Sequence, residues 1–233
     1  MSEAGTLLFA RYAYPPNELG YCGPAGAEAM LRADAPAEIA RRARGFEGAW
    51  SYLELIARSA GIADPLDERV VEAYWVGNDL LGEVDPGELV SWLTDRFRSQ
   101  LGGTWRAAAT RALAHHSFQV YEVYPWAAML SAAPDVAVSI LDRCRIRTGV
   151  VRSVDGETAI IRSRPLVLDG TVLRPGPELD EVAYWPVTLL HALSPGDLVS
   201  LHWDWVCDVI TAAQQDRLET LEARQLARRR PDP

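Results

Sequence analysis

Apolar residues recur at intervals of three and four along most of residues 25–116, the spacing that places them on one face of an α-helix. Gly, Pro and Asp separate these segments. Asp85-Pro86 is typical of a helix start, because proline is tolerated in the first helical turn. We therefore predict a helical region, with segments at 25–33, 36–47, 50–61, 66–81, 85–101 and 104–116.

Two segments join this helical region to the rest of the chain. Residues 117–126 are rich in aromatic and β-branched side chains, which predicts a strand or an extended connector. Residues 134–143 return to helical spacing and predict one more helix.

The pattern changes after Cys144, where runs rich in Val and Ile are broken by Asp-Gly pairs at 155–156 and 169–170. Asp-Gly between such runs is a strong signal for a two-residue hairpin turn. Two further strands are predicted at 180–190 and 196–210.

A final helix is predicted after Thr211, which can cap it, with Leu218, Leu221 and Leu226 on its apolar face. About five short strands joined by hairpins favour a small closed barrel, because closure removes exposed sheet edges. The predicted fold class is α+β. We expect a mainly helical domain at 1–140, suited to partner docking, and a small OB-like β-barrel with a C-terminal helix at 141–233.

The composition narrows the function classes. The chain has 233 residues, is 48% hydrophobic and carries a formal net charge of −9, with no lysine. Nucleic-acid binding depends on clustered positive charge, so we expect no nucleic-acid partner. We find no signal peptide and no apolar run near the roughly 18 residues of a membrane span, so we expect no membrane insertion. Three distant cysteines do not predict a disulfide framework, which favours the cytoplasm.

Cys144 and His202 form the first candidate site. Cys144 precedes the first predicted strand of the barrel and His202 lies near the end of the last, and barrels often bring such ends together. A thiolate and an imidazole suit iron, nickel, copper or zinc, and two protein ligands leave positions open for others. The alternative is structural, with Cys144 a small buried apolar residue and His202 a hydrogen-bonded barrel histidine.

The motifs of residues 142–225 resemble the HypC/HupF family of nickel–iron hydrogenase maturation chaperones. In that family a cysteine is followed five residues later by a glycine and then by a strand that ends in an Asp-Gly turn, as Cys144, Gly149 and Asp155-Gly156 are arranged here. A later Gly-Asp segment of the family runs to a histidine and then to a helix, as residues 196–202 and the segment after Thr211 do.

The resemblance implies that Cys144 and His202 transiently hold iron carrying cyanide and carbon monoxide. It implies a HypC-like maturation chaperone rather than an enzyme, with a metalloenzyme subunit or another maturation protein as partner. Cations near a thiol favour the thiolate, so Arg143, Arg145 and Arg147 are candidate contacts for an anion or a partner. The sequence departs from the family because the cysteine is internal and "WDWVC" follows His202 where the family has "VGFA".

Cys22 supports an alternative hypothesis, a cysteine-nucleophile hydrolase or transferase. The segment "CGPAGAEAML" places Cys22 just before a predicted helix, where the helix dipole favours a thiolate. It resembles the nucleophile segment of papain-like and bacteriocin-processing cysteine peptidases. His115 or His116, ahead of the possible strand, would act as general base. A metal-free protein-interaction adaptor is the third hypothesis.

Overall fold

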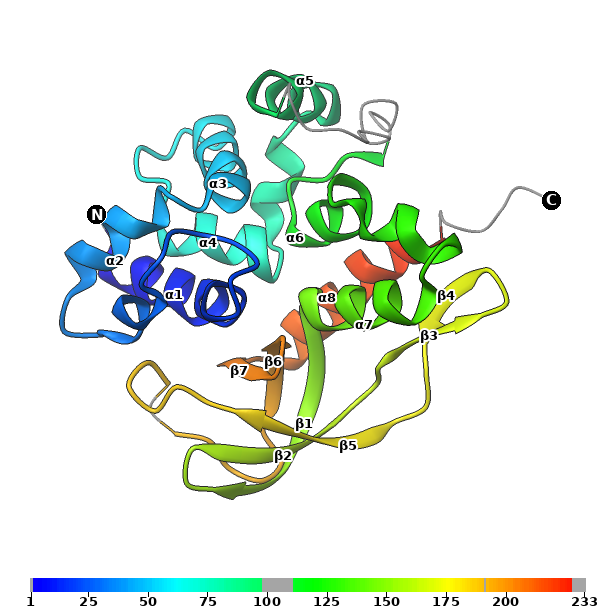
Figure 1. The fold of residues 1–233 in the computed structure, drawn as a ribbon. Coiled ribbons are helices and arrows are strands. Elements are labelled where there is room, and N and C mark those ends of the chain that lie inside the picture. Colours follow the sequence, from blue (N-terminus) through cyan, green and yellow to red (C-terminus); the bar gives the residue numbers. More distant parts are fainter. Residues whose placement is uncertain (1, 98–110, 191, 228–233) are drawn as a thin grey trace. The chain divides into compact units, whose positions relative to one another are not determined.

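The computed structural model describes residues 2–97, 111–190 and 192–227 (Figure 1). The chain divides into two compact units, Met1–Pro125 and Trp126–Pro233. The division lies ahead of the predicted boundary near residue 140, because the helix α7 (Pro134–Cys144) packs against the strand β3 (Leu166–Asp169) of the second unit.

The first unit is helical, as the apolar spacing predicts. Asp85 caps α5 by accepting a hydrogen bond from the Glu88 amide, and Pro86 occupies the first turn of that helix. The elements of this unit are α1 (Glu3–Glu18), η1 (Ala27–Leu31), α2 (Pro36–Ala43), α3 (Glu47–Ser59), α4 (Glu68–Trp75), η2 (Asp79–Glu83), α5 (Pro86–Arg96), α6 (His116–Phe118) and the π-helical η5 (Gln119–Val123).

Three segments of the first unit differ from the sequence predictions. The helix α1 was not predicted, and it contains Pro15 and Pro16, a pair that usually signals the end of a helix. Residues 117–126 are helical at their start and continue as a π-helix, so the predicted strand is wrong. Most of the predicted helix 104–116 lies outside the described residues, and residues 112–115 are not helical.

Aromatic side chains from α1 and α4 form much of the core of the first unit. Tyr12 and Trp75 stack with ring centroids 5.4 Å apart, and Phe9 meets Trp75 at 6.2 Å. The two helices approach closely because α1 has a glycine near its start. A Cβ atom built on Gly5 would lie 2.0 Å from the Leu66 carbonyl oxygen. This packing fixes the end of α4, next to which His116 lies.

The second unit contains a mixed sheet, whose strands follow the helix α7 and precede the helix α8 (Ala212–Leu226) along the chain. Among the described residues it comprises η6 (Pro125–Ser131), α7, β1 (Arg147–Asp155), β2 (Thr158–Ser163), β3, β4 (Val172–Pro175), β5 (Leu179–Tyr184), β6 (Leu198–His202), β7 (Trp205–Val209) and α8. Together with the helical first unit, this establishes the α+β class predicted from the sequence.

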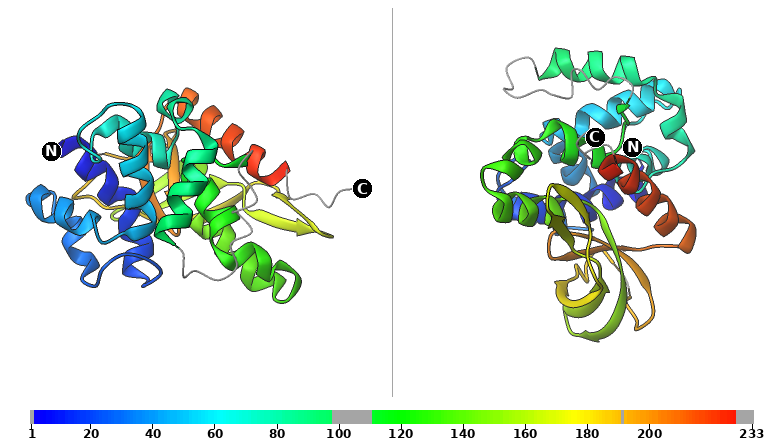
Figure 2. Two further views of the ribbon diagram at one scale, coloured as in Figure 1. Left: turned by 90° about the horizontal axis from the view of Figure 1, so that it is seen from above. Right: turned by 90° about the vertical axis from the view of Figure 1, so that its right-hand side faces the viewer.

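Five strands of the second unit pair in the order β1-β2-β5-β7-β6, and β6 pairs back with β1, so that the sheet closes on itself. The neighbouring strands are antiparallel except β5 and β7, which are parallel and joined at the Tyr184–Trp205 pair. The β3–β4 hairpin, yellow in Figures 1 and 2, forms a separate two-stranded ladder. The predicted Asp-Gly turns are confirmed, with positive φ at Gly156 and Gly170.

The inside of the closed sheet is apolar. Each of its five strands contributes buried side chains, and the loop before β6 adds two leucines. The cluster consists of Val151, Ala159, Ile161, Ala183, Leu190, Leu193, Val199, Leu201 and Val206. The alternation of side chains along each strand therefore sends the other set outward, which decides the direction of His202.

Residues 196–210 do not form the single predicted strand. They form the β6–β7 hairpin, in which His202 pairs with Trp205 across a two-residue turn at Trp203-Asp204. The final helix α8 begins as predicted, because Thr211 and Gln214 form a reciprocal capping box. Among the described residues no helix is both long enough and apolar enough to cross a membrane.

Candidate metal site

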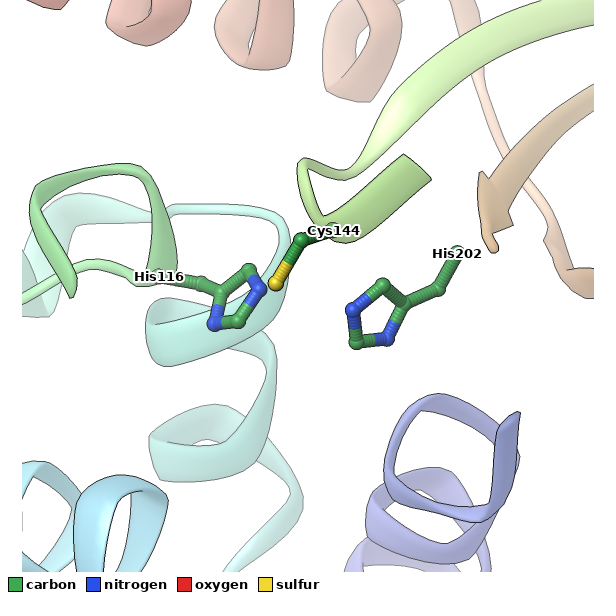
Figure 3. A group of neighbouring side chains, drawn as sticks. All are labelled: His116, Cys144 and His202. Carbon is green, nitrogen blue, oxygen red and sulfur yellow. The ribbon is translucent and has the colours of Figure 1, made fainter. Parts of the chain in front are cut away.

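Cys144 and His202 come together in the second unit. Cys144 is the last residue of α7 and His202 is the last residue of β6. Because Val199 and Leu201 face the core of the closed sheet, alternation points His202 away from that core. The Cys144 sulfur and a ring nitrogen of His202 lie within 4.8 Å of each other, and Figure 3 shows both side chains directed toward the same space.

Both side chains are removed from water. Cys144 is 7% exposed and His202 is 1% exposed. Their separation fits a shared metal ion, because Cys–metal and His–metal bonds are each about 2.0–2.3 Å long for zinc and similar ions. The pair therefore has the chemistry, spacing and burial of two ligands of one transition-metal ion.

His116 belongs to the first unit and is held by aromatic residues of that unit. His116 Nδ1 shares a hydrogen bond of 3.1 Å with the Tyr74 hydroxyl, and its ring lies 4.6 Å from that of Trp75. Such contacts fix the orientation of an imidazole, as outer hydrogen-bond partners do for metal-bound histidines.

The sequence predicts Cys144 and His202 as ligands and assigns His116 only to the alternative enzyme. The structure brings Cys144 and His202 together within the second unit.

The three arginines around Cys144 differ in their surroundings. Arg143 is half exposed and pairs with Asp204 at 3.6 Å. Arg145 is buried, and its guanidinium contacts Asp142 at 3.0 Å and Glu222 at 2.7 Å. Of the three, only Arg143 therefore presents a substantially solvent-exposed charge to an anion or a partner.

Arg145 also lines a pocket beside α8, and the charges of that pocket are balanced. Three arginines and three glutamates line it, so opposite charges are present in equal number. These residues are Arg145, Arg162, Arg164, Glu178, Glu219 and Glu222.

Arg147 is held inside the second unit by Glu181. Its guanidinium contacts both Glu181 carboxylate oxygens, at 2.6 and 3.1 Å, and donates to the Trp203 carbonyl oxygen at 2.7 Å. Burial acts to raise the pKa of Glu181, but the hydrogen bond and charge of Arg147, with a hydrogen bond from Ser163, outweigh it and lower that pKa. Arg147 therefore supports the turn that follows His202 rather than facing solvent.

Cys22 is in a different environment from the one the alternative enzyme requires. The segment after it is not helical until η1 begins at Ala27, and the Asn17 amide holds the Cys22 and Pro24 carbonyl oxygens at 2.8 Å each. Burial of the thiol raises the pKa of Cys22 to about 12, the opposite of an activated nucleophile. Within the described ranges the Cys22 thiol makes no hydrogen bond to either His115 or His116.

His115 is unsuited to the role of general base. It caps α6, and its Nδ1 accepts a hydrogen bond from the Ser117 amide at 3.1 Å. Burial, followed by the charge of His116, lowers the pKa of His115 to about 3 against a smaller opposing effect of the Trp75 backbone. A general base needs a pKa near the working pH. The geometry therefore does not support the Cys22 enzyme hypothesis.

The comparison with known protein families places the whole chain in one group. A family described as "Family of unknown function (DUF6390)" matches residues 1–231. The chain belongs to the DUF6390 family. No curated protein and no solved structure matches it. The DUF6390 match spans both units, so the helices and the closed sheet belong to one family, and it assigns no activity to Cys144 and His202.

Proposed function

We propose that this DUF6390 protein is a metal-binding accessory protein that holds a transition-metal ion through Cys144 and His202. The observation that carries the proposal is the approach of these two buried side chains, whose ligand atoms lie within 4.8 Å of each other in the second unit.

The ligand types select a class of metal. A thiolate and an imidazole suit iron, nickel, copper or zinc, whereas magnesium and calcium prefer oxygen ligands. Two protein ligands leave positions of the metal ion open for other ligands. An open position is what a protein needs if the metal arrives with a small ligand of its own or is passed to a partner.

The more specific proposal is maturation of a metalloenzyme, with nickel–iron hydrogenase as the leading candidate. It rests on the HypC-like order of motifs in residues 142–225. Two structural features agree with it: the segment after Cys144 folds as a closed five-stranded sheet, and α8 follows that sheet. In this proposal the sheet is an OB-like barrel, the cargo is iron with cyanide and carbon monoxide ligands, and the partner is the enzyme's large subunit or another maturation protein.

The test is anaerobic purification from the native host, followed by metal analysis and infrared spectroscopy. The wild type is expected to carry bound metal and, if the cargo is the iron fragment, cyanide and carbonyl stretching bands. Both signals should be absent from Cys144→Ala and retained in Cys207→Ala. Cys207 is the matched control, because it is also buried in the second unit but is outside the group of ligands.

Three outcomes separate the hypotheses. Metal without cyanide or carbonyl bands supports a metal-binding protein with another cargo. Metal content that is equal in the wild type and Cys144→Ala rules out the proposed site. A protein free of metal in every preparation, which still captures a metalloenzyme subunit, favours the adaptor hypothesis.

A further inference from the structure

The turn after His202 has an unusual backbone. Within the described residues Trp203 is the non-glycine residue with a positive φ, at 55°. It occupies the first position of the two-residue β6–β7 turn. Turns of this kind normally place Gly, Asn or Asp at positive φ, because a Cβ atom is disfavoured there and a bulky side chain most of all.

Hydrogen bonds hold Trp203 in this conformation from both sides. Its amide donates to the Arg143 carbonyl oxygen at 2.7 Å, and its carbonyl accepts from the Arg147 guanidinium at 2.7 Å. The next residue, Asp204, forms an ion pair with the Arg143 side chain at 3.6 Å. An unfavourable backbone conformation persists only where surrounding contacts enforce it, as they do here.

The contacts of Trp203 join the two metal ligands of the second unit. Arg143 is the residue before Cys144, and Trp203 is the residue after His202. The bond from the Trp203 amide to the Arg143 carbonyl therefore links the backbone next to one ligand to the backbone next to the other. Arg147 and its partner Glu181 brace the same turn from inside the unit.

We infer that Trp203 is a positioning residue, whose left-handed turn and backbone bond to Arg143 hold His202 at metal-binding distance from Cys144. The inference rests on the proposed function, since it assigns the turn a role at that metal site. The chemistry of the ligands is unchanged by the turn. The turn sets the distance between the two ligand side chains in the metal-free protein. That distance determines how tightly the two side chains can bind one ion.

Two substitutions at Trp203 distinguish the effect of the backbone conformation of the turn from the effect of losing the indole ring. Trp203→Gly and Trp203→Val both remove the buried indole, but glycine adopts positive φ readily and the β-branched valine resists it. Titration with Co²⁺ measures affinity, and the thiolate-to-cobalt charge-transfer band reports whether Cys144 is bound. Relative to Trp203→Gly, we expect Trp203→Val to lose about 10- to 100-fold in affinity, the effect typical of altering an outer contact of a metal site.

A separate variant controls for a loss of stability. Val154→Ala trims a partly buried side chain packed on the core of the closed sheet and should weaken stability without weakening the cobalt band. If Trp203→Val does not fold, Trp203→Ala replaces it, with a smaller loss expected. Equal cobalt affinity in folded glycine and valine or alanine variants would overturn the inference.

Amide hydrogen exchange tests the backbone bond without metal. The Trp203 amide of the wild type should exchange slowly, and the amide of residue 203 should remain protected in Trp203→Gly and become exposed in Trp203→Val. A wild-type Trp203 amide that exchanges at the rate of an unstructured peptide would refute the inference. A protected amide in a wild type that binds no Co²⁺ would instead contradict the proposed metal-binding function and leave the backbone link intact.

Discussion

Replacing Glu181 with glutamine removes the counter-charge of a buried arginine. Arg147 is 3% exposed, and among the described contacts its guanidinium is held by Glu181 and by the Trp203 carbonyl. Removing one partner of a buried ion pair typically costs about 3–5 kcal/mol, because the other charge stays in a poorly solvated site. We expect Glu181→Gln to destabilise the second unit at the lower end of this range, since glutamine can still accept one hydrogen bond.

Urea unfolding monitored by tryptophan fluorescence gives the measurement. With a slope of about 2 kcal/mol per molar urea, a loss of about 3 kcal/mol moves the midpoint down by about 1.5 M. The effect should depend on pH. Because the folded state lowers the pKa of Glu181, its contribution is fully present above the ordinary pKa of about 4.5 and is lost as the pH falls through the lower pKa of the folded state. The difference between wild type and Glu181→Gln should therefore shrink in acid.

The neighbouring residue supplies the control. Asp180 on β5 pairs with Arg162 on the adjacent strand β2, but both side chains are substantially exposed. Ion pairs on the surface contribute little, so Asp180→Asn should leave the midpoint nearly unchanged. If Asp180→Asn and Glu181→Gln shift the midpoint equally, or if the Glu181→Gln effect does not shrink as the pH falls through the folded-state pKa of Glu181, burial of the Arg147–Glu181 pair is not the source of the stability.

Three further predictions concern other parts of the chain. Because the pKa of Cys22 is raised to about 12, its alkylation at pH 8, followed by mass spectrometry, should be slower than that of an ordinary thiol by on the order of a thousandfold; labelling as fast as that of free cysteine would contradict this. Thr211→Ala should cost about 1 kcal/mol in urea unfolding through loss of the α8 cap, and an unchanged midpoint would argue against the capping box. Gly149→Ala should cost about 1–3 kcal/mol, because the new Cβ would lie 2.5 Å from Ile161, whereas Gly82→Ala, with open space around it, serves as its tolerated control.

Local sequence signals predicted much of the second unit. The Asp-Gly pairs at 155–156 and 169–170 form the expected turns, because glycine there takes the positive φ that the turn geometry requires. The third hairpin, β6–β7, was missed for the opposite reason. Its turn places Trp203 at positive φ, and Asp204 in the second position is by itself a weaker signal than an Asp-Gly pair.

The first unit was less predictable wherever tertiary packing overrides local preference. The aromatic and β-branched run at 117–126 favours a strand, yet Phe118, Val120 and Tyr121 are buried as parts of a helical segment. The helix α1 continues through Pro15 and Pro16, where local preference predicts an end. Neither outcome is encoded in residue spacing alone.

The candidate site was half predictable. Cys144 and His202 were paired because they flank the ends of the predicted barrel strands, and their ligand atoms lie within 4.8 Å. The arginines flanking Cys144 were predicted as contacts for an anion or a partner, whereas Arg145 and Arg147 are buried by partners distant in the sequence, Glu222 and Glu181.

X-ray absorption spectroscopy of the metal-loaded protein tests the central claim most directly. The account predicts one sulfur neighbour at about 2.3 Å and an imidazole nitrogen at about 2.0–2.1 Å if the bound ion is zinc. The sulfur neighbour should disappear in Cys144→Ala and persist in Cys207→Ala, and the imidazole contribution should fall in His202→Ala. A shell of oxygen and nitrogen without sulfur in the wild type, or a sulfur neighbour that persists in Cys144→Ala, would contradict the account.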